Sequence, residues 1–318
     1  MMQIYTSVEE VEEESRKAGF DLEYTQLGKG KYLGTFPAQT HSRSTFIVES
    51  TSIEITAKGR TDDDTYMVTG GSESLIFNGK PNRRDELVIY PPGTELHAAT
   101  RGSCHLAQIC MPVTVVDSYL KASDLDAENR RASNPIRFTL SPDVTSWFRS
   151  SVRLLAKADA PDDGLAQNLE HHILAYLTRI DGLGSGNGNV RGRGRPVEFY
   201  EQTFRLALDY IHANLRSQVA LDELCLATNI SLRTLQRIFI KRTGMSPRKY
   251  ILTCKLNAIR RELVDASCHE ATVSAVALKY KLNHLGRFSS SYRELFQEYP
   301  SETLSRKRTA HTRSFQLA

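Results

Sequence analysis

Residues 273–304 read VSAVALKYKLNHLGRFSSSYRELFQEYPSETL and contain two short helical patterns that meet at a tight turn. After the turn, Arg287 and Arg293 share one side of a helix with a row of small hydroxyl side chains. The opposite side is apolar and consists of Phe288, Tyr292, Leu295 and Phe296. A helix with this pattern packs its apolar side on a core and offers its cationic side to a polyanion. The stretch therefore predicts a helix that binds nucleic acid.

The same plan occurs about fifty residues earlier. A short helical pattern at 221–229 is followed by a turn at Asn229-Ile230 and a second helix at 231–244. Ser231 and Gly244 are the residue types that begin and end helices. A short helix, a tight turn and a cationic helix form a helix-turn-helix module, whose second helix enters the major groove. Two such modules predict a protein that reads DNA.

A long helix is predicted between the two modules. It follows Ser246-Pro247 and reads RKYILTCKLNAIRRELVDA, with apolar residues at helical spacing. We expect a stiff connector, with Lys255, Arg260 and Arg261 available for phosphates. On such a connector the two recognition helices would enter successive major grooves about 34 Å apart on one side of B-DNA.

Two phrases, GMSPRKYI (244–251) and HLGRFSSSYRELF (284–296), resemble the AraC/XylS family of bacterial transcription regulators, in its XylS-like branch. The resemblance covers about residues 203–305 and implies a domain that contacts double-stranded DNA. The implied base-reading positions are Arg233, Gln236, Arg237 and Lys241 in the first module and His284, Arg287 and Ser290 in the second. Activation through contact with RNA polymerase follows from the resemblance alone.

The second module departs from the family pattern at two places. Lys281-Leu282 stands at the turn where Gly-Phe is usual, and Ser290 stands where a basic or long polar residue is common. Arg can fork onto guanine and Gln onto adenine, whereas a serine reaches less far. We expect the second module to read fewer bases and to depend more on phosphate contacts, such as one from Arg293.

Residues 22–116 have the texture of strands. Short β-branched and aromatic runs recur about every ten residues between Gly, Pro, Asp and Asn, which is typical of an antiparallel sandwich or barrel. The phrase ELVIYPPGTELHA (86–98) resembles the PPG turn of cupin-like sensor domains. The predicted fold class is α+β with two domains: a cupin-like β-barrel with flanking helices, then an all-α double helix-turn-helix.

Two amphipathic helices are predicted after the barrel. The first begins at Ser141-Pro142, and the second follows 162–164 and extends to about residue 180. Such a helix pair either covers the barrel or forms the seam of a dimer, and the sequence leaves both open. The family resemblance favours a homodimer.

A Gly-rich stretch separates the halves. We expect an effector-binding and dimerisation domain at 1–182, a linker at 183–197, a DNA-binding domain at 198–308 and a flexible tail at 309–318. The linker is either a solvated tether or an anion-binding segment. In the second case Arg191 and Arg195 have the RxxxR spacing that resembles the PilZ motif for cyclic di-GMP, although the companion part of that motif is not evident.

The two halves of the chain also differ in net charge. Residues 198–318 carry 19 Lys and Arg against 11 Asp and Glu, a net charge of +8, and residues 1–197 carry 22 against 26, a net charge of −4. The basic half therefore suits a polyanionic partner.

The effector is the least determined feature. The XylS-like branch suggests an aromatic carboxylate, the linker arginines suggest cyclic di-GMP, and His97 is a candidate effector-binding residue beside the PPG turn. Cupin enzymes hold a metal with an HxH pair, which is absent around His41, His97 and His105. We therefore expect no catalytic residue, no metal and no cofactor, and a cupin enzyme fused to a DNA-binding domain is the disfavoured alternative.

The remaining composition indicates a cytoplasmic protein without a membrane segment. No apolar run approaches the ~18 residues that a membrane helix needs. The acidic N-terminus is unlike a secretory signal, and five cysteines without CxxC spacing suggest reduced thiols.

Overall fold

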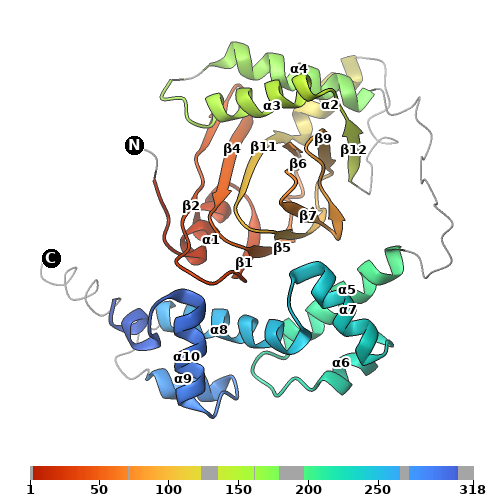
Figure 1. Ribbon diagram of the computed structural model, residues 1–318. Helices are drawn as coiled ribbons and strands as arrows, with labels where there is room; N and C mark the ends of the chain where they lie inside the picture. The colour runs from red at the N-terminus through yellow and green to blue at the C-terminus, as the bar shows by residue number, and fades with distance from the viewer. Residues whose placement is uncertain are drawn as a thin grey trace, which may run out of the picture. The chain divides into compact units, whose positions relative to one another are not determined.

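The structure, a computed structural model, describes residues 3–70, 72–122, 135–160, 162–178, 197–265 and 272–306 (Figure 1). Its contacts divide the chain into two units. The first unit comprises Met1–Tyr24 and Leu33–Arg193, and the second comprises Thr25–Tyr32 and Gly194–Ala318. A short segment from near the start of the chain thus belongs with the C-terminal helices, which no sequence pattern predicted.

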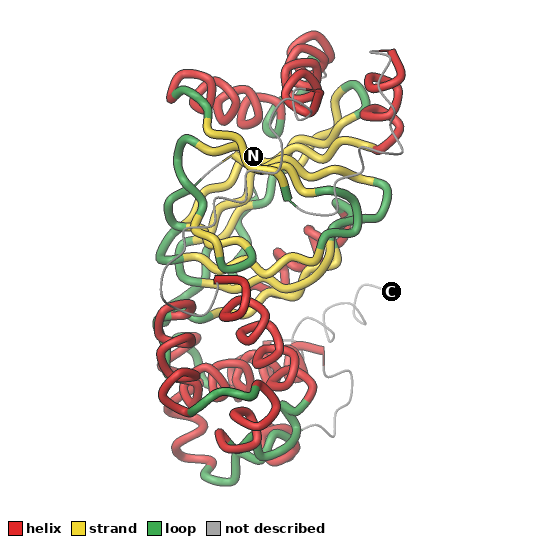
Figure 2. The backbone as a smooth tube through the Cα atoms, turned by 90° about the vertical axis from the view of Figure 1, so that its right-hand side faces the viewer, coloured by secondary structure: helices red, strands yellow, loops and turns green. Residues whose placement is uncertain are grey.

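Two sheets form the body of the first unit (Figure 2). One has the strand order β1-β5-β10-β7-β8, formed by Asp21–Gln26, Ile55–Arg60, Glu95–Thr100, Leu75–Phe77 and Lys80–Pro81. The other has the order β12-β9-β6-β11-β4-β2, formed by Ile136–Thr139, Glu86–Tyr90, Thr65–Gly70, Cys104–Pro112, Ser44–Thr51 and Gly34–Thr35. In addition, β3 (Ala38–His41) pairs with β4. The predicted β-rich N-terminal domain is confirmed.

Strand β11 has one face toward a core shared with helices and the other face toward a cavity. It pairs antiparallel with β4 from Cys104↔Thr51 to Cys110↔Thr45. Successive side chains of a strand point to opposite faces. Ala107 and Ile109 accordingly pack in a core with helices, whereas Leu106 and Gln108 line a cavity on the other face.

Helices cover the outer face of the larger sheet (Figure 1). They are α2 (Val113–Ala122), α3 (Pro142–Leu155) and α4 (Asp163–Thr178). The shared core includes Phe148, Val152, Leu155, Leu169 and Ile173 together with strand residues. Of the two roles predicted for the pair of helices after the barrel, covering the sheet is the one that the structure shows.

The approach of α3 to the sheet is close. A Cβ atom on Gly70 at the end of β6 would lie 2.9 Å from the ring of Phe148, so a glycine is required where these elements meet. The acidic stretch near the N-terminus forms helix α1 (Val8–Lys17), and Ser7 caps it by accepting a hydrogen bond from the amide of Glu10.

Helices α5 to α10 make up the rest of the second unit. Their bounds are Val197–Ala213, Leu221–Thr228, Leu232–Thr243, Pro247–Asp265, Val273–Lys279 and Leu285–Phe296. The predicted all-α domain is confirmed. Across the ranges that the structure describes, none of the helices has the length and apolar character needed to cross a bilayer.

We predict that Phe148→Ala lowers the free energy of unfolding of the first unit by about 3–5 kcal/mol, because the ring is 3% exposed and its loss leaves a cavity. Leu154→Ala on the same helix is the control, and should change it by less than about 0.5 kcal/mol because that side chain is 61% exposed. Denaturant unfolding followed by the fluorescence of the single tryptophan, Trp147, reports on this unit. Equal losses for the two variants would contradict the packing described.

Candidate nucleic-acid interface and a cavity in the first unit

The first helix-turn-helix module is formed by α6 and α7. Helix α6 ends at Asn229, whose backbone is left-handed (φ 51°), and Ser231 then caps α7 by accepting a hydrogen bond from the amide of Thr234 at 3.3 Å. Helix α7 ends at Gly244, also left-handed at φ 70°. The predicted turn and both predicted ends of α7 are confirmed.

Helix α7 has one buried face and one exposed face. Leu235, Ile238 and Phe239 are buried in the core of the module. The exposed residues include the four predicted base-reading positions, Arg233, Gln236, Arg237 and Lys241. Their arrangement follows from the 3.6-residue period of the helix and leaves a mainly cationic surface facing water.

Arg237 is oriented by an aromatic neighbour. Its guanidinium donates a hydrogen bond to the hydroxyl of Tyr200 on α5 at 3.2 Å and lies 5.6 Å from the centre of that ring. This contact limits the rotamers of an otherwise exposed side chain. A side chain restrained in this way would lose less conformational entropy on binding a base or a phosphate.

The second module is formed by α9 and α10. Lys281, at the turn, has φ 60°, and its amide donates to the carbonyl of Leu278 at 3.0 Å. This is the left-handed region, which glycine adopts without a steric penalty and where a side chain costs roughly 1–2 kcal/mol. The turn forms in spite of this cost.

All four predicted residues of α10 and its cap, His284, Arg287, Ser290 and Arg293, are exposed. The hydroxyl of Ser290 donates to the carbonyl of Gly286 at 3.0 Å, so its hydrogen is used within the helix. Arg293 donates to the hydroxyl of Tyr299 at 2.6 Å and lies 4.7 Å from the centre of that ring. Arg287 therefore carries the longest exposed cationic side chain in the first turns of α10.

Helix α8 connects the two modules and is buried by both. Tyr250, Ile251 and Cys254 belong to the core of the first module. Leu256, Ile259 and Leu263 belong to the core of the second. One continuous helix thus fixes how the two modules are placed within this unit.

The prediction that the cations of α8 are available for phosphates was wrong for two of them. Lys255 is 6% exposed and donates to the carbonyls of Ser217 and Tyr280 at 2.8 and 2.9 Å. Arg260 is 7% exposed and forms an ion pair with Glu298, which is also buried. The helix is enclosed by two cores, so these cations satisfy buried acceptors instead of facing solvent. Arg261 is half-buried.

Residues 25–32, which we call the strap, complete the second unit. The amide of Gln26 donates to Oδ1 of Asn257 on α8, and Nδ2 of Asn257 donates to the carbonyl of Gln26, both at 2.9 Å. Nε2 of Gln26 also donates to the carbonyl of Leu295 on α10 at 2.9 Å. Gln26 and Asn257 are 3% and 1% exposed, so this is a buried polar contact.

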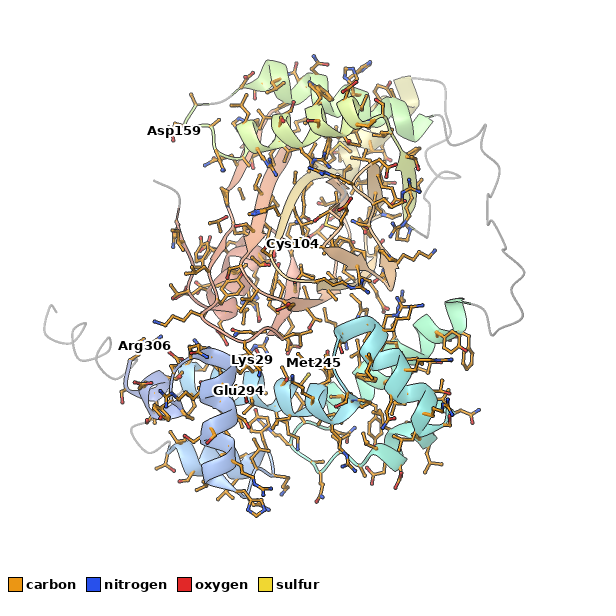
Figure 3. All side chains as sticks on the ribbon, in the orientation of Figure 1. Lys29, Cys104, Asp159, Met245, Glu294 and Arg306 are labelled. Atoms are coloured by element: carbon orange, nitrogen blue, oxygen red, sulfur yellow. The ribbon has the colours of Figure 1, made fainter. Side chains whose placement is uncertain are left out.

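Further contacts hold the strap on both modules. Leu27 is buried in the core of the first module, and the amide of Gly30 donates to the carbonyl of Leu295 at 3.0 Å. Lys29 forms an ion pair with Glu294, and Figure 3 shows the two labels side by side. The strap therefore bridges the connector α8 and the recognition helix α10.

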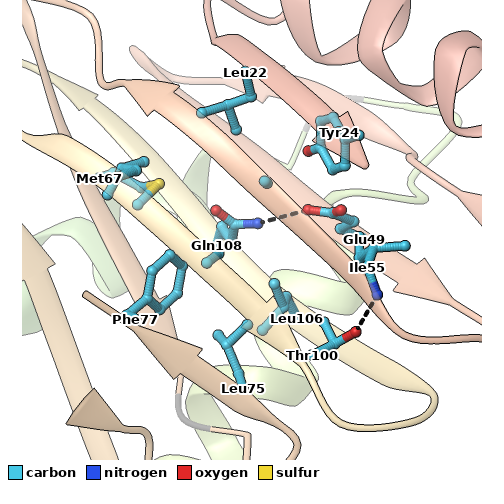
Figure 4. A pocket seen from close by; sticks show the side chains of 13 residues that line it. Leu22, Tyr24, Glu49, Ile55, Met67, Leu75, Phe77, Thr100, Leu106 and Gln108 are labelled. Carbon is cyan, nitrogen blue, oxygen red and sulfur yellow. Dashed lines mark hydrogen bonds between the residues drawn. The ribbon is translucent and has the colours of Figure 1, made fainter. Parts of the chain in front are cut away.

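A cavity of about 40 Å³ lies within the first unit (Figure 4). Thirteen residues line it: Leu22, Tyr24, Glu49, Ile55, Ala57, Met67, Leu75, Phe77, Leu96, Ala98, Thr100, Leu106 and Gln108. Most are apolar, and Glu49 is the acidic member. A few convergent polar groups in an apolar cavity are typical of small-molecule sites, although ligand-bound sites are usually several hundred Å³.

Of the three candidate effector-binding residues, the structure describes His97 alone. His97 lies on β10 between the lining residues Leu96 and Ala98, so its side chain belongs to the opposite face of the strand and the cavity gives it no role. Arg191 and Arg195 lie outside the described residues. Among the residues that the structure describes, no group of three or more His, Cys, Asp or Glu side chains is placed as metal ligands are.

Comparisons with known proteins support the assignment of the second unit as a helix-turn-helix domain. A helix-turn-helix domain model matches residues 224–306. The XylDLEGF operon transcriptional activator of Pseudomonas putida is 37% identical over 223 residues, which are 69% of this chain and 66% of that protein. XylDLEGF operon transcriptional activator 2 of the same species is 33% identical over 138 residues, which are 43% of this chain and 84% of that protein.

The chain belongs to the AraC/XylS family. It spans 66% of the length of the first of these relatives. A crystal structure of a probable AraC family transcriptional regulator from Rhodopseudomonas palustris is 33% identical, covers 33% of this chain and 96% of that chain, and has a TM-score of 0.32.

For this AraC/XylS-family chain we predict that Asn257→Ala loosens the strap. The change leaves the amide and carbonyl of Gln26 buried without partners, at a cost of about 1–3 kcal/mol. Hydrogen exchange of the peptide that contains residues 25–32 should become about fivefold to a hundredfold faster. Arg248→Ala, at an exposed position of the same helix, should leave this exchange unchanged. Unaltered protection in Asn257→Ala would show that the amide pair does not hold the strap.

Proposed function

We propose that this protein is a sequence-specific, DNA-binding transcriptional activator whose activity responds to a small molecule. The observation that carries the proposal is the pair of exposed cationic helices, α7 and α10, held by the shared helix α8. The net charge of +8 over residues 198–318 favours the approach of DNA to this unit. Relatives described as transcriptional activators support the direction of regulation. The proposal assigns the chain no catalytic step.

In this proposal the two modules contribute unequally to sequence choice. Arg233, Gln236 and Arg237 on α7 contact base edges, because Arg can fork onto guanine and Gln onto adenine. Lys241, in the last turn of α7, adds positive charge beside these base contacts. On α10 and its cap, Arg287 and His284 contact bases, whereas Arg293 contacts phosphate and Ser290 contributes little because its hydroxyl is bonded to Gly286. Phosphate contacts give affinity, and base contacts give specificity.

The cavity of the first unit is the proposed site of the small molecule. Its wall includes Leu22 and Tyr24 of β1, and the same strand continues into Gln26, which is bonded to Asn257 in the second unit. A ligand that moves these wall residues acts, through the continuous backbone, on the strap that bridges α8 and α10. The Gly/Arg linker is a second covalent connection. Together they supply a coupling between ligand and DNA affinity.

Partners follow from the same proposal. The active form is a homodimer, and transcription is raised through contact with RNA polymerase. For the effector, the XylS-like relatives suggest an aromatic carboxylate.

A second effector candidate is cyclic di-GMP, favoured by the RxxxR spacing of Arg191 and Arg195. If these arginines clasp it, cyclic di-GMP raises the melting temperature of the wild type by mass action and leaves Arg191→Ala/Arg195→Ala unchanged. No shift in the wild type at high micromolar concentration would remove this candidate.

For the DNA claim we predict that Arg237→Ala weakens binding to a specific site by about 1–3 kcal/mol and binding to random DNA much less. A site is first selected from a random duplex library, and affinities are then measured by fluorescence anisotropy at fixed salt. Arg237→Lys should keep the phosphate attraction but lose most of the specificity, because an ammonium lacks the guanidinium fork.

Arg16→Ala on α1 is the charge-matched control and should leave both affinities unchanged, since Arg16 is exposed in the first unit. If Arg237→Ala weakens binding to specific and to random DNA by the same amount, Arg237 contacts phosphate and not a base. Failure to select any site would contradict the proposed function itself.

A further inference from the structure

Glu49 places a carboxyl group on the wall of the cavity (Figure 4). It lies on β4, opposite Leu106 of β11, and is 7% exposed. Nε2 of Gln108 donates to it at 3.5 Å, which is longer than the usual 2.9–3.0 Å, and Tyr24 on the same wall favours its ionised form. These neutral groups leave the charge of an ionised Glu49 poorly compensated.

The thirteen lining residues that the structure describes include no Lys, Arg or His. Burial raises the pKa of Glu49 to about 7, and the hydrogen bonds from Tyr24 and Gln108 lower it only in part. The nearby thiol of Cys104 has its own pKa raised by burial to about 11, so it stays neutral. Glu49 is therefore about half ionised near neutral pH, and the described lining supplies no cation for its ionised form.

This electrostatic setting discriminates between ligand classes. A carboxylate ligand would bring a second negative charge into a poorly solvated space, and like charges at one site repel strongly. An ammonium group would supply the missing counter-charge and donate hydrogen bonds. The cavity thus disfavours the aromatic carboxylate suggested by the XylS-like relatives.

The wall also limits the size of the ligand. About 40 Å³ holds a few water molecules, so a larger molecule must move part of the lining. Leu22 and Tyr24 lie on β1, which is at the edge of its sheet and has β5 as its neighbour among the described strands. Moving this edge strand therefore costs less free energy than moving any other part of the wall. Met67, with a flexible side chain, can adapt on the other side.

We propose that this cavity binds a small primary amine with an apolar body, whose ammonium group pairs with Glu49 while Tyr24 and Gln108 hold the carboxylate in place. The proposal rests on the proposed effector response and names its ligand class. The apolar lining takes the body of the ligand, and the movement of β1 on entry is the event passed on to the strap.

The test uses three probes of one shape, benzylamine, benzyl alcohol and benzoate, titrated into the full chain by calorimetry. In the wild type, benzylamine should bind roughly tenfold to a hundredfold more tightly than benzyl alcohol, and benzoate most weakly. Its affinity should rise from pH 6 to pH 8, because the ionised form of Glu49 makes the pair. Glu49→Gln, which has the same shape, should lose both the amine preference and this pH dependence. Glu73→Gln, the same change at an exposed glutamate of the first unit outside the lining, should keep both.

Tighter binding of benzoate than of benzylamine would overturn the proposal. An amine preference that survives in Glu49→Gln, or no binding of benzylamine at millimolar concentration, would do the same. DNA affinity measured on the same samples separates this failure from failure of the proposed function, because a wrong ligand class leaves specific DNA binding intact.

Discussion

Helix α8 is the constraint on which the DNA-binding unit depends. It must bury apolar side chains on two sides, because its first half completes one helix-turn-helix core and its second half completes the other. Its 19 residues span roughly 28 Å at 1.5 Å per residue. That length is close to the ~34 Å between successive major grooves on one side of B-DNA. The same enclosure explains why Lys255 and Arg260 bond to protein groups.

The strap adds a polar constraint to this apolar one. Asn257 sits in the middle of α8, where a buried amide is costly unless it is fully bonded, and the backbone of Gln26 supplies its partners. The DNA-binding unit therefore includes residues from the start of the chain. The strap begins with Thr25 and Gln26, the last residues of β1, and Leu22 and Tyr24 of the same strand line the cavity. A short stretch of backbone thus connects the cavity lining with the residue that is bonded to α8.

Much of the fold was predictable because it follows from local pattern. The caps at Ser231 and Gly244, the period of α7 and the Pro at the start of α3 depend on near neighbours in sequence. Long-range contacts were not predictable. Asn257 is an ordinary helical residue until Gln26, 231 positions away, is placed beside it. Likewise Glu49 lies in a strand-like run, and only the fold places it on a cavity that is lined from β1, β4, β5, β6, β7, β10 and β11.

The central claim is that α7 and α10 read one face of DNA as a pair fixed by α8. Hydroxyl-radical footprinting of the protein on a selected site tests it directly. For each protein copy, the account predicts two protected major-groove segments on one face, centred about 10 base pairs apart. A single protected groove per copy, or two segments on opposite faces of the duplex, would contradict it.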